Sequence, residues 1–490
     1  MGEIKQQTIS GVKWSAIERF SIQGVTFLLG LVVARLLTPA DYGLVGMVGI
    51  FFGISQTLID SGFGNALVRK PDRTEADYYT AFYFSFAASI FFASLLCIGA
   101  PWIAEFFKQP ILCPMTRVMS LNLIIGTLGM IPSTKLYVAL DFKTSAKVNF
   151  ISAVASGVFG LVLAFLGYGA WSLVWQNLAS NVLRVILIWF YKPCKLLFQF
   201  SKHSFKQLFG YGSKLAAANI LHTAYSEITT LAIGKFYSPA SLGNYYRGTG
   251  MATLPINTVS NVVGKVTFPI LSRIQEDKER LIKVYRSYIA LMTIPVGFLC
   301  ILMAALAKPL ILFLLTAKWA DAIIFLQIYV FAVVFDPICR LNLNLLQVIG
   351  RSDLSLKLEV IKKTLAMVIL ICAIPFGVVS ICISKVIYTQ IALVLNTYYT
   401  GKLFGLGYWQ QWKDFSPYLL YSVIACLPSL ALAYLCPWPM VSLILGVSIS
   451  TVFYIIILCK RHDAVFLKQI APILQKLIYK LPKKCQFSIF

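Results

Sequence analysis

Apolar stretches of about 20 residues recur along this 490-residue chain, and they constrain its fold more than any other feature. A helix needs roughly 20 mainly apolar residues to cross about 30 Å of hydrocarbon. Unpaired backbone groups are too costly in lipid, so membrane-spanning segments must be helices or the strands of a closed barrel. These stretches are longer and more continuous than barrel strands, which alternate over about 10 residues. The sequence therefore predicts an all-α integral membrane protein.

Composition excludes a large soluble domain. Hydrophobic residues make up 58% of the chain and charged residues 13%, whereas soluble domains carry about 25% charged residues. The net charge of +24 comes from basic residues in short connections and in the tail, which is typical of cytoplasmic loops rather than of nucleic-acid binding. The cysteines are scattered, no C-x-x-C occurs, and the histidines lie far apart, so we predict no metal site and no cofactor.

The apolar stretches, read against Pro, Gly and charged breakers, predict about 14 transmembrane helices. Their predicted ranges are 11–35, 41–68, 77–104, 113–138, 144–167, 170–191, 209–235, 240–270, 285–312, 320–348, 354–375, 378–400, 413–435 and 438–459. Lys and Arg gather in alternate connections. By the positive-inside rule this places both termini in the cytoplasm.

An internal repeat divides the chain. Residues 35–43 read RLLTPADYG and residues 235–243 read KFYSPASLG, two hundred positions later. Residues 169–172 (GAWS) and 377–380 (GVVS) form a second matching pair. Parallel repeats of this kind build transporters whose halves rock around a central site. We therefore predict two pseudo-symmetric six-helix lobes around a central cavity, followed by two more helices and a basic amphipathic cytoplasmic tail: 1–200, 201–405, 406–462 and 463–490.

Polar residues form stripes on the first helix of each predicted lobe. The first stripe has the spacing i, i+4, i+8 and i+11, which defines one helix face, and the second follows two hundred residues on. The two stripes are Ser15, Arg19, Gln23 and Thr26, then Asn219, Thr223, Ser226 and Thr230. Basic residues exceed acidic ones here, so we predict a cationic, hydrated cavity that binds an anionic substrate. The predicted substrate-binding residues are Arg19, Gln23, Asn219, Arg247 and Lys265. The alternative is that these groups pair across helices and fix the packing.

Asp336 lies within a predicted span, directly before Pro337 and four residues before Arg340. One interpretation is an ion pair within the helix, beside a carbonyl that the proline leaves free. The other is a coupling site at which the carboxylate takes up Na⁺ or H⁺. Three further acidic residues are candidates for the same role: Glu18, Glu227 and Asp60.

Residues 34–44 (ARLLTPADYGL), 60–68 (DSGFGNALV) and 167–174 (GYGAWSLV) resemble the polysaccharide transporters of the MOP superfamily, nearest to the WzxC-like branch. The resemblance implies two six-helix lobes around a cationic cavity, as in lipid II flippases and multidrug exporters. It also implies a flippase in the bacterial cytoplasmic membrane, with undecaprenyl-pyrophosphate-linked oligosaccharide as substrate, alternating access and coupling to an ion gradient. Polysaccharide polymerases and export machinery would be its partners. Arg19 resembles in placement the first-helix arginines of such cavities.

Two other functions remain open from sequence. A polysaccharide polymerase or ligase is also polytopic, but it carries a large outer loop with Arg or His, and the outer connections here are short. A drug/cation antiporter of the same fold would suit an acidic cavity better than a basic one. The sequence favours a transporter over an enzyme.

Overall fold

The computed structural model describes residues 21–60, 63–70, 72–194, 198–461, 463, 465–467 and 472. Within these residues every regular element is a helix. Nine helices of the described chain are long and apolar enough to cross a membrane, and a bent pair of helices makes a tenth. The protein is therefore an all-α polytopic membrane protein. The chain divides into two compact units, Met1–Gly243 and Asn244–Phe490.

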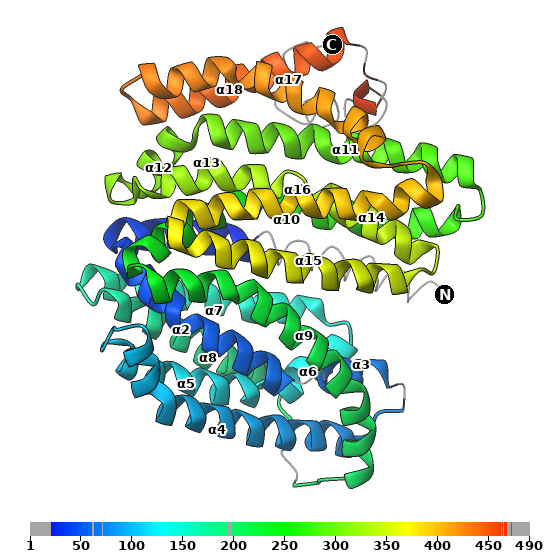
Figure 1. Cartoon of the computed structure of the whole chain (residues 1–490). Coiled ribbons are helices and arrows are strands. Elements are labelled where there is room, and N and C mark those ends of the chain that lie inside the picture. The colour runs from blue at the N-terminus through cyan, green and yellow to red at the C-terminus, as the bar shows by residue number, and fades with distance from the viewer. Residues whose placement is uncertain are drawn as a thin grey trace, which may run out of the picture. The chain divides into compact units, whose positions relative to one another are not determined.

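The first unit begins, in its described part, with a helix over Ser21–Leu36. Figure 1 labels the helices that follow, from blue through cyan to green. They are α2 (Pro39–Asp60), α3 (Phe63–Arg69), α4 (Glu75–Phe106), α5 (Leu112–Leu128), α6 (Met130–Val138), α7 (Phe142–Phe165), α8 (Ala170–Tyr191) and α9 (Lys202–Phe236). Helix α10 (Pro239–Arg273) starts in this unit and continues into the second.

The second unit ends in the pair α17 and α18, which pack against each other (orange in Figure 1). Its helices after α10 are α11 (Lys278–Ala305), α12 (Ala307–Leu315), η1 (Ala317–Trp319), α13 (Ala322–Val333), α14 (Asp336–Val348), α15 (Ser352–Ala373), η2 (Ile374–Phe376), α16 (Val378–Phe404), α17 (Tyr408–Leu435) and α18 (Pro439–Lys460). The packing boundary falls after Gly243, whereas the repeat places the predicted lobe boundary at residue 200. The lobe boundary stays a prediction.

The repeated segments begin their helices in the same way. At the start of α2, the Asp41 N–H donates to Thr38 Oγ1 at 3.4 Å, and the Thr38 N–H and hydroxyl donate to Asp41 Oδ2 at 2.8 and 2.7 Å. Ahead of α10, the Ser241 N–H donates to Ser238 Oγ at 3.1 Å, and the two hydroxyl oxygens are 2.9 Å apart. Each cap satisfies N–H groups that the first helical turn leaves without a partner. The resemblance between the two sequences therefore extends to their local structure.

The same two segments also contact each other reciprocally. A Cβ on Gly43 would lie 1.8 Å from the carbonyl oxygen of Pro239, and a Cβ on Gly243 would lie 1.8 Å from that of Pro39. Glycine is the residue that lets two helix backbones approach this closely. The start of α2 and the start of α10 are thus related by a local two-fold.

The second pair of matching segments shares a backbone conformation. Gly169 precedes α8 with φ +53°, and Gly377 precedes α16 with φ +101°. Both values lie in the region that residues with a Cβ rarely adopt. The glycines at these two helix starts are therefore required by the backbone.

A bend of 44° separates α5 from α6, at Gly129. Pro132 follows in the first turn of α6 and has no N–H, so it cannot donate to the carbonyl of Leu128 four residues earlier. The indole Nε1 of Trp189, on α8, donates to that carbonyl at 3.0 Å. The indole thus supplies the bond that the proline removes, as a bent membrane helix requires.

Three fully buried polar side chains, Asn342, Thr400 and Gln411, join the helices of the second unit. Asn342 Nδ2 donates to Gln411 Oε1, and Gln411 Nε2 donates to Asn342 Oδ1, both at 2.9 Å. The Thr400 hydroxyl donates to Asn342 Oδ1 at 2.8 Å, and Gln411 also donates to the carbonyl of Leu406. This reciprocal amide pair connects α14 and α16 to α17, so the last two helices are an integral part of the unit.

Candidate functional sites

Several predicted site residues lie outside the described part of the chain. Glu18 and Arg19 lie before residue 21, where the described part of the chain begins. Of the predicted tail 463–490, the structure describes only residues 463, 465–467 and 472. Lys265 belongs to α10, but its side chain is also outside the description. Their roles remain predictions from sequence.

The predicted stripe of the second lobe lies on α9, in the first unit. The side chain of Asn219 is exposed, and Thr223 lies one turn further along the same helix. The hydroxyl oxygens of Thr223 and Thr57, on α2, are 3.2 Å apart. Gln23 and Glu227 are half-buried in this unit. The α9 face thus combines an exposed amide with a polar contact to α2.

Arg247 lies on α10 in the second unit and is half-buried. Its guanidinium carbon lies 5.8 Å from the ring centre of Trp319, which is fully buried. A guanidinium over an indole face gains electrostatic attraction from the ring. The aromatic ring therefore orients the positive charge that the sequence predicts for substrate binding.

Asp336 is the first residue of α14, at a short break between α13 and α14 within the single candidate span Ala322–Val348, which matches the predicted span 320–348. An acidic group is favoured at this end of a helix by the helix dipole. Within the described chain Asp336 forms no ion pair with Arg340, contrary to one of the two interpretations. Three positively charged side chains act electrostatically on its carboxylate. In decreasing order of effect they are Lys385, Arg340 and Lys362.

Lys385 on α16 and Lys362 on α15 are functional candidates that sequence reasoning missed. Lys362 is 5% exposed, and its ammonium lies 2.5 Å from a carboxylate oxygen of Glu359. Lys385 lies well inside the span Val378–Phe404, where a lysine is costly. That position within an apolar stretch was the available signal. Asp336 thus lies in a group of charges from three helices.

Asp60 ends α2, and its side chain is exposed. Gln56, one turn earlier, donates from Nε2 to Asp60 Oδ1 at 2.8 Å. The charge that acts on Asp60 from another helix is Arg184 of α8. Arg184 was also missed from sequence. Its signal was its spacing from Asn177 and Asn181, which places all three residues on one face of α8.

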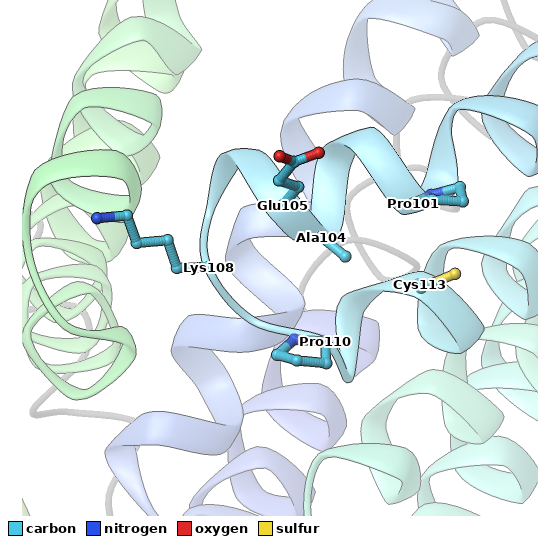
Figure 2. A pocket seen from close by; sticks show the side chains of 6 residues that line it. All are labelled: Pro101, Ala104, Glu105, Lys108, Pro110 and Cys113. Carbon is cyan, nitrogen blue, oxygen red and sulfur yellow. The ribbon is translucent and has the colours of Figure 1, made fainter.

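A pocket of about 470 Å³ lies where α4 turns into α5. Figure 2 shows its lining residues, with the side chains of Glu105 and Lys108 extending in different directions. The lining is mainly apolar and includes Pro101, Pro110 and Cys113. None of the predicted site residues lines it. This recess lacks the convergent polar groups that a substrate site needs.

Comparisons with known proteins identify the family. Residues 32–324, more than half of the chain, match the family described as "Polysaccharide biosynthesis protein". The teichuronic acid biosynthesis protein TuaB of Bacillus subtilis (strain 168) is 22% identical, over 72% of this chain and 74% of its own length. The lipopolysaccharide biosynthesis protein WzxC of Escherichia coli (strain K12) is also 22% identical, over 73% of each chain.

Among solved structures, the lipid II flippase MurJ in an inward closed conformation superposes with a TM-score of 0.73. The match covers 92% of this chain and 100% of that structure, at 14% sequence identity. Such an identity shows a shared fold and nothing finer. The chain therefore belongs to the polysaccharide biosynthesis protein family and shares the fold of MurJ.

Proposed function

We propose that this protein is a flippase for undecaprenyl-pyrophosphate-linked oligosaccharides in the bacterial cytoplasmic membrane. It carries repeat units of O-antigen, capsule or exopolysaccharide from the inner to the outer leaflet by alternating access. The observation that carries the proposal is the match to a polysaccharide biosynthesis family on the fold of a lipid II flippase. Lipid II is itself a lipid-linked saccharide, so family and fold support the same class of substrate.

The proposed architecture has about 14 membrane spans, because the remaining long helices are also long enough to cross. Helices α9 and α10 have 35 residues each, which corresponds to about 52 Å at 1.5 Å per residue. Both helices are as long as the apolar spans, but their sequences are less apolar. Two six-helix lobes with both termini in the cytoplasm place these polar helices along a hydrated central cavity.

The proposed substrate site uses positive charge to balance the pyrophosphate. Burying an unpaired phosphate charge is prohibitive, whereas a guanidinium or ammonium offsets that cost. Arg19, Arg247 and Lys265 supply these charges, with Gln23 and Asn219 as hydrogen-bonding partners. The polyprenyl tail stays in lipid while the headgroup crosses.

Transport in proteoliposomes tests this function directly. Fluorescently labelled lipid-linked oligosaccharide should appear in the opposite leaflet at a rate at least about tenfold above that of empty vesicles. Replacing Arg19, Arg247 and Lys265 together with Ala should remove most of this rate, because each charge-assisted hydrogen bond contributes about 1.5–3 kcal/mol.

A matched control replaces three exposed lysines near helix ends, Lys147, Lys206 and Lys283, with Ala and should leave the rate unchanged. Undiminished flipping in the Arg19, Arg247 and Lys265 variant would refute the charge-balancing site. Failure of the unaltered protein to flip any lipid-linked saccharide, combined with export of cationic drugs, would favour an antiporter instead.

A further inference from the structure

Asp60 and Arg184 form a pair of opposite charges within the first unit that the proposed pyrophosphate site does not use. Each acts electrostatically on the other, from α2 and from α8. They form no direct ion pair in the described chain, and the guanidinium of Arg184 makes no hydrogen bond to a described residue. A guanidinium has five N–H donors, and within a membrane span these require acceptors.

Amide side chains flank the two charges. Gln56 holds Asp60 through one carboxylate oxygen, at 2.8 Å. Asn181, one turn before Arg184, donates from Nδ2 to Oδ1 of Asn122 on α5 at 2.9 Å. We call these five residues, Gln56, Asp60, Asn122, Asn181 and Arg184, the α2–α8 polar site. Its members come from three helices that pack against one another.

The depth of this site follows from the ends of α2 and α8. The carboxylate of Asp41 lies 3.1 Å from where a Cβ on Gly169 would be, so the two helices start at the same level. At 1.5 Å per residue, Asp60 is about 28 Å along α2 and Arg184 about 22 Å along α8. Both charges therefore lie toward the other end of the span, which is the cytoplasmic end in the proposed orientation.

The chemistry of the site matches a saccharide better than a phosphate. A carboxylate accepts hydrogen bonds from hydroxyl groups, a guanidinium donates to hydroxyl oxygens, and amides do both. One acidic and one basic group leave the site close to neutral, so a polyol can bind both of them. A phosphate would gain from Arg184 but would be repelled by Asp60.

We propose that the α2–α8 polar site binds the saccharide part of the lipid-linked substrate, with Asp60 and Arg184 contacting sugar hydroxyls. This inference rests on the proposed function and refines it, because it separates sugar recognition from the balancing of pyrophosphate charge. It also assigns Asp60 to substrate recognition rather than to ion coupling.

Binding to the purified full-length protein in detergent tests the assignment with two probes. One probe is the pool of lipid-linked saccharides extracted from a strain that lacks this protein, and the other is undecaprenyl pyrophosphate without sugar. Arg184→Ala and Asp60→Asn should each weaken binding of the glycosylated probe about tenfold or more, since each removes hydrogen bonds to a charged group. Binding of the bare pyrophosphate should change less than about twofold.

Two further variants make the result decisive. Arg184→Lys keeps the positive charge but loses the planar guanidinium with its paired donors, so it should retain only part of the affinity for the glycosylated probe. This variant also tests the site if Arg184→Ala fails to fold. Lys147→Ala removes an exposed positive charge from the same unit and should bind both probes normally.

The outcomes separate this inference from the proposed function. Equal weakening for both probes would make the site a pyrophosphate site, and no weakening for either would make the charges a packing feature. Each result would overturn the inference while leaving flipping by the unaltered protein intact. An unaltered protein that neither binds nor flips the glycosylated probe would overturn both proposals.

Discussion

Gly43 lies directly against the backbone of Pro239, with space for a hydrogen atom but not for a methyl group. Gly243 has the same relationship to Pro39, so the two copies of the repeat meet through matching residues. A contact made twice by related residues constrains both helix starts at once. It also gives the duplication a physical consequence that can be measured.

Gly43→Ala and Gly243→Ala should each destabilise the protein by about 1–3 kcal/mol, because an added methyl group forces the two backbones apart. The two substitutions should have similar effects, since their surroundings are equivalent. Thermal unfolding of the detergent-solubilised protein measures the change. Gly49→Ala is the matched control on α2, because a Cβ there meets nothing within 4 Å. Equal melting temperatures for Gly43→Ala and Gly49→Ala would contradict the close contact.

Gln411→Leu should destabilise the second unit by about 1–3 kcal/mol, because it breaks both buried hydrogen bonds between the side-chain amides of Gln411 and Asn342. The neighbouring Gln410 is exposed, so Gln410→Leu removes the same chemical group without breaking a buried bond and should melt like the unaltered protein. Melting temperatures of the two variants, measured side by side, check the prediction. Equal melting temperatures for Gln411→Leu and Gln410→Leu would show that the amide pair contributes little.

Asp336→Asn should abolish stimulation of transport by an ion gradient while leaving substrate binding in place. A metal cation needs several oxygen ligands, whereas the charged groups that act on this carboxylate are the cations Lys385, Arg340 and Lys362; a proton needs only one carboxylate oxygen. We therefore expect an imposed pH gradient, and not a sodium gradient, to drive flipping in proteoliposomes. The control is Asp353→Asn, at an exposed acidic residue that is paired with Arg351. Full stimulation of the Asp336→Asn variant would remove Asp336 from the coupling role.

The proposed orientation can be tested with single cysteines in a cysteine-free background. Cys436, between α17 and α18, should react in intact cells with a maleimide that cannot cross the membrane. Cys194, between α8 and α9, should react only after permeabilisation. Burial raises the pKa of the Cys194 thiol, so its thiolate fraction and its labelling rate should increase as the pH rises above neutral. Labelling of Cys194 in intact cells would show that the protein has the opposite orientation in the membrane.

The fold class and the paired helix starts could be predicted from sequence, because apolar length and the Pro–Gly pattern are local signals. The caps at Thr38 and Ser238 follow directly from the repeated residues. The break at Asp336 and the bend at Gly129 were not predicted, because an apolar stretch looks the same whether its helix is straight or bent. The spatial partners of the candidate residues were harder still. Arg184 lies 124 positions from Asp60, and no local pattern joins them.

The indole of Trp189 bonded to the carbonyl of Leu128 has an evolutionary consequence. Lipid offers no donor that could replace the indole, so its loss alone would leave a bare carbonyl wherever Pro132 is kept. Replacing Pro132 by a residue with an N–H would make the indole dispensable. Homologues should therefore keep both Pro132 and Trp189 or replace both. Where both have been replaced, the proline should have been replaced before the tryptophan.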